Sequence, residues 1–245
     1  MTKGVSRAVI FDLDGTLIDS APDIHAAANR LMERHGFAPF TPAETRSFIG
    51  SGVPHFIACC LRARGRPGDA ALRAKLIAEF IDLYETAVTL TRVYPDAAEA
   101  LLALASGHYA LGLCTNKPVM PARAVLAHLG LDAHFPVVIG GDSLTVRKPD
   151  PASLRAVAAG LGARDVVYVG DSEVDAETAE RAGVPFALYT EGYRKGPVDG
   201  IPHARAFADF GDLPGLVESI FGAGTGAGAP PGSAARETPR KENFT

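Results

Sequence analysis

Residues 9–17 read Val-Ile-Phe-Asp-Leu-Asp-Gly-Thr-Leu, an apolar run that ends in two carboxylates two positions apart. The segment Val9 to Phe11 favours a strand buried on both faces of a parallel sheet. Asp12 then stands at the carboxyl end of that strand, which is where ligands bind in open α/β sheets. A buried carboxylate there needs a metal, another cation or hydrogen-bond donors to offset its desolvation. Gly15 lets the backbone leave the strand at an angle that other residues resist.

The same pattern has two structural alternatives. Asp-x-Asp-Gly also occurs in ordinary turns and at the start of calcium loops. A calcium loop of the EF-hand type needs Glu at its twelfth position, where this chain has Asp23, and a helix before it instead of a strand. Taken alone, residues 9–17 leave both a functional site and a simple turn open.

Three further segments place groups suited to phosphate and metal at the end of a strand or the start of a helix. They are residues 109–117 (Tyr-Ala-Leu-Gly-Leu-Cys-Thr-Asn-Lys), residues 147–151 (Arg-Lys-Pro-Asp-Pro) and residues 166–175 (Val-Val-Tyr-Val-Gly-Asp-Ser-Glu-Val-Asp). A hydroxyl and backbone N–H groups at a strand end can hold phosphate oxygens. Asp150 and Pro151 suit the N-cap and first position of a helix, which leaves Lys148 just outside it.

In order and spacing, the four segments resemble the four motifs of the haloacid dehalogenase superfamily of phosphohydrolases. The resemblance extends from residue 9 to about residue 190. Within the superfamily, residues 11–20, 46–52 and 115–117 are similar to those of bacterial phosphoglycolate phosphatases. The resemblance implies a magnesium-dependent phosphomonoester hydrolase that acts through an aspartyl-phosphate and hydrolyses 2-phosphoglycolate to glycolate and phosphate.

The resemblance also implies a role for each carboxylate. Asp12 would be the nucleophile, and Asp14 would be the general acid for the leaving alkoxide and then the general base for water. Mg²⁺ would be held by the side chains of Asp12 and Asp171 and by the backbone carbonyl of Asp14, which fits a hard cation that prefers oxygen ligands. Asp175 would not bind the metal itself but would orient a water bound to it.

The remaining motif residues complete the charge balance expected for phosphoryl transfer. Lys148 would supply the cation beside the Asp12 carboxylate, because this chemistry depends on positioning and on neutralising phosphate oxygens. Thr115 and the backbone of Asn116 would hold another phosphate oxygen. We expect Lys117 to be a surface residue.

Between the first motif and residue 93 the sequence carries helical signals and no clear strand. The fold expected is α/β: a Rossmann-like parallel sheet core with helices on both faces, formed by residues 1–18 and 91–222, and an inserted all-helical cap at residues 19–90. Residues 223–245 lack large apolar side chains except near their end and are expected to form a disordered tail.

Substrate choice should reside in the cap, because the core can bind only phosphate and metal. The strongest candidates are Arg46 and the turn around Gly50. Glycines at residues 50 and 52 let backbone amides approach an anion, and Arg46 could attract the carboxylate of a small acid. The alternative is that both glycines merely link helices while Arg46 lies on a solvated face.

The resemblance implies a small phosphorylated metabolite as the partner, and length and composition agree with it. The chain has 245 residues, 47% of them hydrophobic, and a formal charge of −4, which argues against a nucleic-acid partner. We expect no membrane partner, because no apolar stretch reaches membrane-spanning length and the first strand leaves no room for a signal peptide. Three cysteines, two of them adjacent, fit a reducing cytoplasm better than a disulfide framework. The sequence leaves a monomer and a homodimer equally open.

Three alternative functions use related chemistry. Another capped phosphatase, or a phosphomutase, could act through Asp12 on a sugar phosphate or a nucleotide. A dehalogenase is disfavoured, because Asp14 supplies an acid that carbon–halogen displacement does not need. A receiver-type signalling module also phosphorylates an aspartate at a strand end, but its domain is about half this length.

Overall fold

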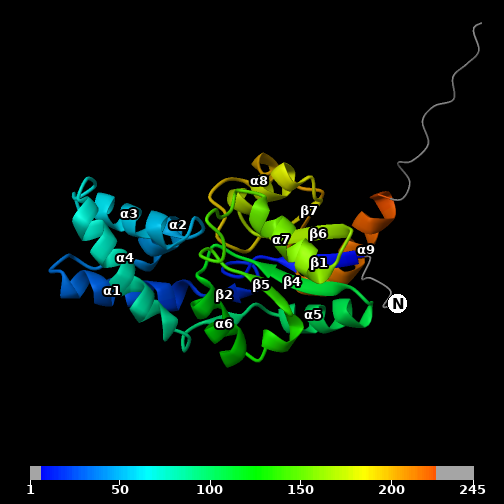
Figure 1. The fold of residues 1–245 in the computed structure, drawn as a ribbon, viewed down its shortest axis with the longest axis horizontal. Helices are drawn as coiled ribbons and strands as arrows, with labels where there is room; N and C mark the ends of the chain where they lie inside the picture. The colour runs from blue at the N-terminus through cyan, green and yellow to red at the C-terminus, as the bar shows by residue number, and fades with distance from the viewer. Residues whose placement is uncertain (1–6, 225–245) are drawn as a thin grey trace, which may run out of the picture.

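The computed structural model describes residues 7–224 and contains a six-stranded parallel sheet in the order β5-β4-β1-β6-β7-β8 (Figure 1). The strands are β1 (Arg7–Phe11), β4 (Ala110–Cys114), β5 (Val137–Ile139), β6 (Asp165–Gly170), β7 (Phe186–Tyr189) and β8 (Arg205–Phe207). Strand β1 lies in the middle, between β4 and β6. The expected parallel α/β fold is therefore confirmed.

Helices cover both faces of this sheet, as expected. They are α5 (Ala97–Ser106), α6 (Val119–His128), α7 (Ala152–Leu161), α8 (Glu173–Ala182) and α9 (Leu213–Gly224). Side chains alternate along β1: Val9 and Phe11 pack in the cluster with α5, α6 and α9, while Ala8 and Ile10 pack in the cluster with α7 and α8. Because every residue of β1 after Arg7 is buried, this strand can be uniformly apolar.

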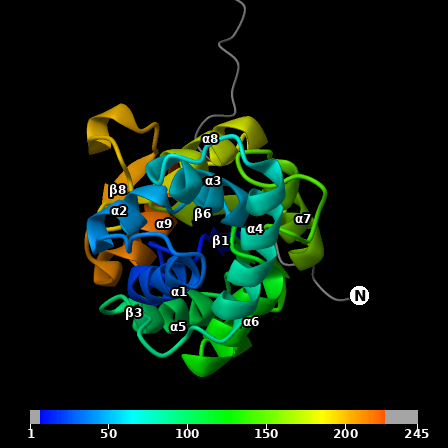
Figure 2. The same ribbon diagram turned by 90° about the vertical axis from the view of Figure 1, so that its left-hand side faces the viewer.

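A helical unit is inserted between two short strands, β2 (Ile18–Asp19) and β3 (Arg92–Val93), which pair antiparallel. Its helices are α1 (Ala21–Arg34), α2 (Pro42–Phe48), α3 (Val53–Ala63) and α4 (Ala70–Glu85). They enclose their own apolar cluster, centred on buried side chains such as Leu31, Ile57 and Phe80. Figure 2 shows this unit, the cap, in front of the sheet. The cap boundaries at residues 19 and 90 remain a proposal.

Local signals in the cap agree with the structure. Thr41 and Glu44, in the order typical of a helix start, form a capping box at the start of α2, and Gly36 and Gly65 adopt positive φ just after α1 and α3. None of the helices within residues 7–224 is long and apolar enough to cross a membrane.

Three features differ from the expectation. The β2–β3 pair and β8 were not predicted; each is only two or three residues long, too short for a periodic signal. The helix after Lys148 begins one residue late, with Pro151 as the N-cap and the Asp150 carboxylate accepting a hydrogen bond from the Ala152 N–H. Of the expected tail, residues 223 and 224 end α9, and 225–245 lie outside the described residues.

Candidate active site

The carboxyl ends of the central strands bring the predicted motif residues to one place. Asp12 follows β1, Thr115 follows β4, Asp171 follows β6, and Lys148 comes from the loop after β5. All four side chains are buried. The Asp12 N–H donates to the carbonyl of Val169 in β6, so the backbone of Asp12 still continues the hydrogen bonding of the sheet. The parallel topology is what unites residues that are up to 159 positions apart in the sequence.

Three buried carboxylates share this site: Asp12, Asp171 and Asp175 each offer an oxygen atom within 4.8 Å of the others. In the described part of the chain, a single ammonium pairs with them. Lys148 Nζ lies 2.8 Å from Asp12 Oδ1 and 2.7 Å from Asp175 Oδ1. Three carboxylates beside one ammonium place an excess of negative charge at a buried site.

This crowding shifts the pKa values of Asp12, Asp171 and Lys148. Burial raises the pKa of Asp12 to about 7, against the opposing effect of the Lys148 ammonium. Burial, with Asp175 and Asp12 adding to it, raises the pKa of Asp171 well above its ordinary value. Burial by itself would lower the pKa of Lys148, but Asp12 and Asp175 together raise it. A divalent cation with oxygen preference fits this donor set, because it would compensate the excess charge.

Asp175 is saturated by protein donors and is poorly placed to be a metal ligand. Its Oδ1 accepts from Lys148 Nζ at 2.7 Å and from the Tyr168 hydroxyl at 2.8 Å, and its Oδ2 accepts from the Ser172 hydroxyl at 2.6 Å. Burial alone would raise the pKa of Asp175, but Lys148 and these donors lower it. Asp12 differs, because its Oδ1 accepts no hydrogen bond from the described residues and meets Lys148 only as an ion pair. Each oxygen of Asp171 accepts a single hydrogen bond, so the lone pairs left for a cation are on Asp12 and Asp171.

Asp171 is oriented from two directions. Its Oδ1 accepts from the Thr16 hydroxyl at 2.8 Å, and its Oδ2 accepts from the backbone N–H of Tyr193 at 2.5 Å. Thr16 belongs to the first motif, whereas Tyr193 lies in the loop after β7, which no sequence motif marked. These bonds hold the Asp171 carboxylate beside Asp12 before any metal binds.

Asp14 faces the cap, and its environment corrects one prediction. The Oδ1 atom of Asp14 accepts from the Ser20 hydroxyl at 2.6 Å and from Lys117 Nζ at 3.1 Å. Lys117 is only 6% exposed, so the expectation that it lies on the surface was wrong. Its ammonium also donates to the hydroxyl of Tyr84, from α4 of the cap. The only signal in the sequence was its place two residues after Thr115, which does not tell the direction of the side chain.

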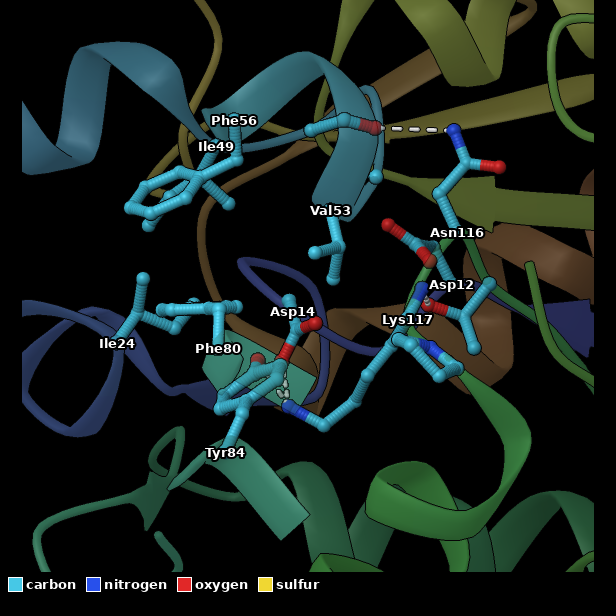
Figure 3. Close-up of a pocket in the computed structure, with 14 residues that line it drawn as sticks. Asp12, Asp14, Ile24, Ile49, Val53, Phe56, Phe80, Tyr84, Asn116 and Lys117 are labelled. Atoms are coloured by element: carbon cyan, nitrogen blue, oxygen red, sulfur yellow. Dashed lines mark hydrogen bonds and ion pairs between the residues drawn. The ribbon is translucent and has the colours of Figure 1, made fainter. Parts of the chain in front are cut away.

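A pocket separates these groups from the cap (Figure 3). Its floor is Asp12, Asp14, Thr115, Asn116, Lys117 and Pro118, and its cap side is Ile24, Ile49, Gly50, Gly52, Val53, Phe56, Phe80 and Tyr84. Asn116 joins the two sides, because its Nδ2 donates to the carbonyl of Gly50 and to that of Lys148, both at 3.1 Å. The cap is thus docked on the core directly above the carboxylates.

The two cap residues predicted to choose the substrate occupy different places. Gly50 lines the pocket, next to the docking contact with Asn116. Arg46 is exposed and is not among the pocket-lining residues; its guanidinium lies 4.6 Å from the centre of the Tyr193 ring and donates to the carbonyl of Gly192 at 3.4 Å. A role for Arg46 in binding the substrate remains a prediction.

Comparison with known proteins identifies the family. The model of the family described as haloacid dehalogenase-like hydrolase matches residues 9–189, which include the end of β1 and the segments carrying Thr115, Lys148 and Asp171. The chain belongs to the haloacid dehalogenase-like hydrolases. The resemblance noted in the sequence is therefore confirmed, and the receiver-type alternative is set aside.

Relatives of this hydrolase match nearly their whole length. A phosphoglycolate phosphatase of Cereibacter sphaeroides is 53% identical over 214 residues, which cover 87% of this chain and 98% of that protein. A phosphoglycolate phosphatase of Rhodobacter capsulatus is 46% identical with the same coverage. A crystal structure described as a predicted phosphoglycolate phosphatase from Haemophilus somnus 129pt superposes with a TM-score of 0.79 at 26% identity, over 87% of this chain and 99% of that one.

Proposed function

We propose that this hydrolase is a magnesium-dependent phosphatase that converts 2-phosphoglycolate to glycolate and phosphate through an aspartyl-phosphate. The observation that carries the proposal is the placement of Asp12: a buried carboxylate at the end of the central strand, 2.8 Å from the Lys148 ammonium and two residues before Asp14. The choice of 2-phosphoglycolate is supported by the names of the relatives that match over 98% of their length.

In the first step, an oxygen of Asp12 attacks phosphorus while the bond from phosphorus to the ester oxygen breaks. Asp14 gives a proton to the departing glycolate oxygen. In the second step, Asp14 takes a proton from water as the water oxygen attacks the same phosphorus, and the bond to Asp12 breaks. Phosphate leaves, Asp12 regains its carboxylate and Asp14 regains its proton.

The other residues of the floor stabilise charge on the phosphoryl oxygens. Lys148 places a buried ammonium beside Asp12, and Asp175 holds that ammonium in position at 2.7 Å. The Thr115 hydroxyl and the backbone of Asn116 offer donors to another oxygen. In addition, Asn116 keeps the cap loop at Gly50 over the site, which limits the access of bulk water to the reacting groups.

A Mg²⁺ ion would be held by the side chains of Asp12 and Asp171 and by the backbone carbonyl of Asp14. When bound, it supplies positive charge that neutralises a phosphate oxygen and the Asp12 carboxylate. The side chain of Asp14 must be oriented for proton transfer, and a hydrogen bond of 2.6 Å from the Ser20 hydroxyl orients it.

The nucleophile is tested with Asp12→Asn. This variant keeps the shape of the side chain and removes the attacking charge, so we expect phosphate release from 2-phosphoglycolate to fall by at least about 10³-fold. Steady-state turnover should be measured with Mg²⁺ on a panel that also contains sugar phosphates and nucleotides, and the melting temperature serves as the control for folding. Substantial turnover by Asp12→Asn would contradict the mechanism, and a wild-type preference for a sugar phosphate or nucleotide would contradict the substrate.

A further inference from the structure

The pocket beneath the cap has an apolar cap side and a charged floor. Its cap side presents five apolar side chains, Ile24, Ile49, Val53, Phe56 and Phe80. Among the residues that line it, the one cation is Lys117. We propose that Lys117, positioned by Tyr84 of the cap, recognises a carboxylate on the leaving group of the substrate. This inference rests on the proposed phosphatase function, since it assumes that the phosphoryl group is bound at Asp12.

The position of the ammonium agrees with the geometry of the reaction. Asp14 has to reach the ester oxygen in order to give it a proton, and Lys117 Nζ lies 3.1 Å from Asp14 Oδ1. In 2-phosphoglycolate a single methylene separates the ester oxygen from the carboxylate. A group so close to the ester oxygen must lie beside Asp14, which is where Lys117 stands (Figure 3).

The hydrogen bonds of Lys117 leave capacity for a ligand. A lysine ammonium has three N–H donors. Two are directed to Asp14 Oδ1 and to the Tyr84 hydroxyl, and the third has no partner among residues 7–224. A buried ammonium with an unused donor at the wall of a pocket is suited to an anion that enters the pocket.

Tyr84 makes the recognition dependent on the cap. It extends from α4, is almost fully buried and accepts a hydrogen bond from Lys117; the ammonium also lies 3.8 Å from the centre of its ring. The ammonium is therefore located by one carboxylate of the core and one phenol of the cap. Arg46, the cation predicted from sequence, is stacked on Tyr193 instead and does not line this pocket.

The residues around Lys117 also favour some leaving groups over others. A leaving group without a carboxylate gains nothing from Lys117, and a large polar one, such as a sugar, would bury hydroxyls against the apolar side chains of the cap. We therefore infer that the preferred leaving groups are short and carry one carboxylate next to the ester carbon.

The test compares two substrates that differ in one group: 2-phosphoglycolate, and 2-hydroxyethyl phosphate, in which a hydroxymethyl group replaces the carboxylate. For Lys117→Met we expect kcat/KM to fall about 10- to 100-fold on 2-phosphoglycolate, mainly through KM, because a charge-assisted hydrogen bond is lost. On 2-hydroxyethyl phosphate the loss should stay within about 3-fold. Tyr84→Phe, a milder change, should show the same selectivity with a smaller loss.

Two controls separate recognition from other effects. Lys75→Met removes the same charge from the exposed face of α4, where Lys75 is paired with Glu79. It should leave kcat/KM unchanged on both substrates. Arg46→Ala should affect both substrates equally. Equal losses on both substrates for Lys117→Met would overturn the inference and assign Lys117 to the positioning of Asp14, and a loss confined to 2-phosphoglycolate in Arg46→Ala would overturn it in favour of Arg46.

A binding measurement distinguishes this inference from the proposed function. 2-Phosphoglycolate is titrated calorimetrically into Asp12→Asn protein with and without Lys117→Met. Weaker binding by about 10-fold or more in the double variant supports the inference, even if the wild type turns over another ester faster. Equal binding, or no binding to either protein, overturns it, whereas the proposed function fails on the wild-type turnover alone.

Discussion

Gly15 has a steric role that its position in a turn does not reveal. Its φ is +89°, a conformation that glycine adopts at little cost. A Cβ atom at this position would lie 2.5 Å from Asp171 Oδ2 and 2.8 Å from the Tyr193 ring. The sequence accounts for the turn, but the close approach of Asp171 arises from a residue 156 positions away.

A matched pair of substitutions separates the cost of positive φ from the steric effect on Asp171. Gly15→Ala and Gly36→Ala both place alanine at positive φ, which by itself costs about 1–2 kcal/mol in the free energy of unfolding. A Cβ at Gly36 meets nothing within 4 Å, so this variant should keep its activity. Gly15→Ala should displace Asp171 and lower kcat/KM by at least about 10-fold, since small misplacements of a site residue are costly. Equal kinetics for both variants would contradict the steric role.

At the scale of elements, Tyr193 from the loop after β7 satisfies the backbone N–H groups at the start of helix α1. Helix α1 begins at Ala21, but the side chain of its N-cap residue, Ser20, makes no capping bond because it donates to Asp14. The Tyr193 hydroxyl instead accepts from the Ser20 N–H at 2.8 Å and the Ala21 N–H at 2.9 Å, and donates to Asp19 at 2.6 Å. Tyr193 therefore ties the loop after β7 to the junction of β2 and α1.

Removing this hydroxyl should loosen the junction. For Tyr193→Phe we expect the free energy of unfolding, measured by chemical denaturation, to fall by about 1–3 kcal/mol, because two backbone donors and a carboxylate lose a partner. Tyr94→Phe is the control: the Tyr94 hydroxyl is buried without a hydrogen bond to the described residues, so its loss should cost almost nothing. A similar loss of stability in both variants would show that the Tyr193 hydroxyl does not hold the junction.

At the scale of the whole molecule, the excess of buried negative charge links folding to metal binding. The unfolded chain does not assemble Asp12 and Asp171, so an ion that binds both stabilises only the folded state. Since burial raises the pKa of Asp12 to about 7 and raises that of Asp171, protons compete with the ion for these oxygens as the pH falls through this range. The stabilisation by metal should therefore be large above pH 7 and decline toward acid.

Thermal unfolding measures this linkage. In EDTA-treated protein, Mg²⁺ at about 100 times its dissociation constant should add about 2.7 kcal/mol to the free energy of unfolding, and for a chain of this length that raises the melting temperature by about 5–10 °C. The shift should be largest near pH 8 and shrink toward pH 5. Asp171→Asn should abolish it, while Asp82→Asn, on an exposed position of α4, should keep it. An unchanged shift in Asp171→Asn would exclude that residue as a ligand.

Much of the fold follows from local patterns in the sequence. The apolar run at residues 9–11 and the helical signals between the first motif and residue 93 each predict elements that the structure contains. Polar residues at the ends of parallel strands are expected to meet, and Asp12, Thr115 and Asp171 do so. These predictions succeed because the signals are short in range and repeat along the chain.

The direction of Lys117, the position of Arg46 and the contacts of Tyr193 were decided by tertiary structure alone. The ammonium of Lys117 is buried because Asp14, 103 positions away, and Tyr84 of the cap meet it there. Tyr193 contacts a junction more than 170 residues earlier in the chain. The sequence by itself determined the chemistry of the core, since neighbouring residues encode it. The packing of cap against core determined which cation lines the pocket, because that choice depends on contacts between distant segments.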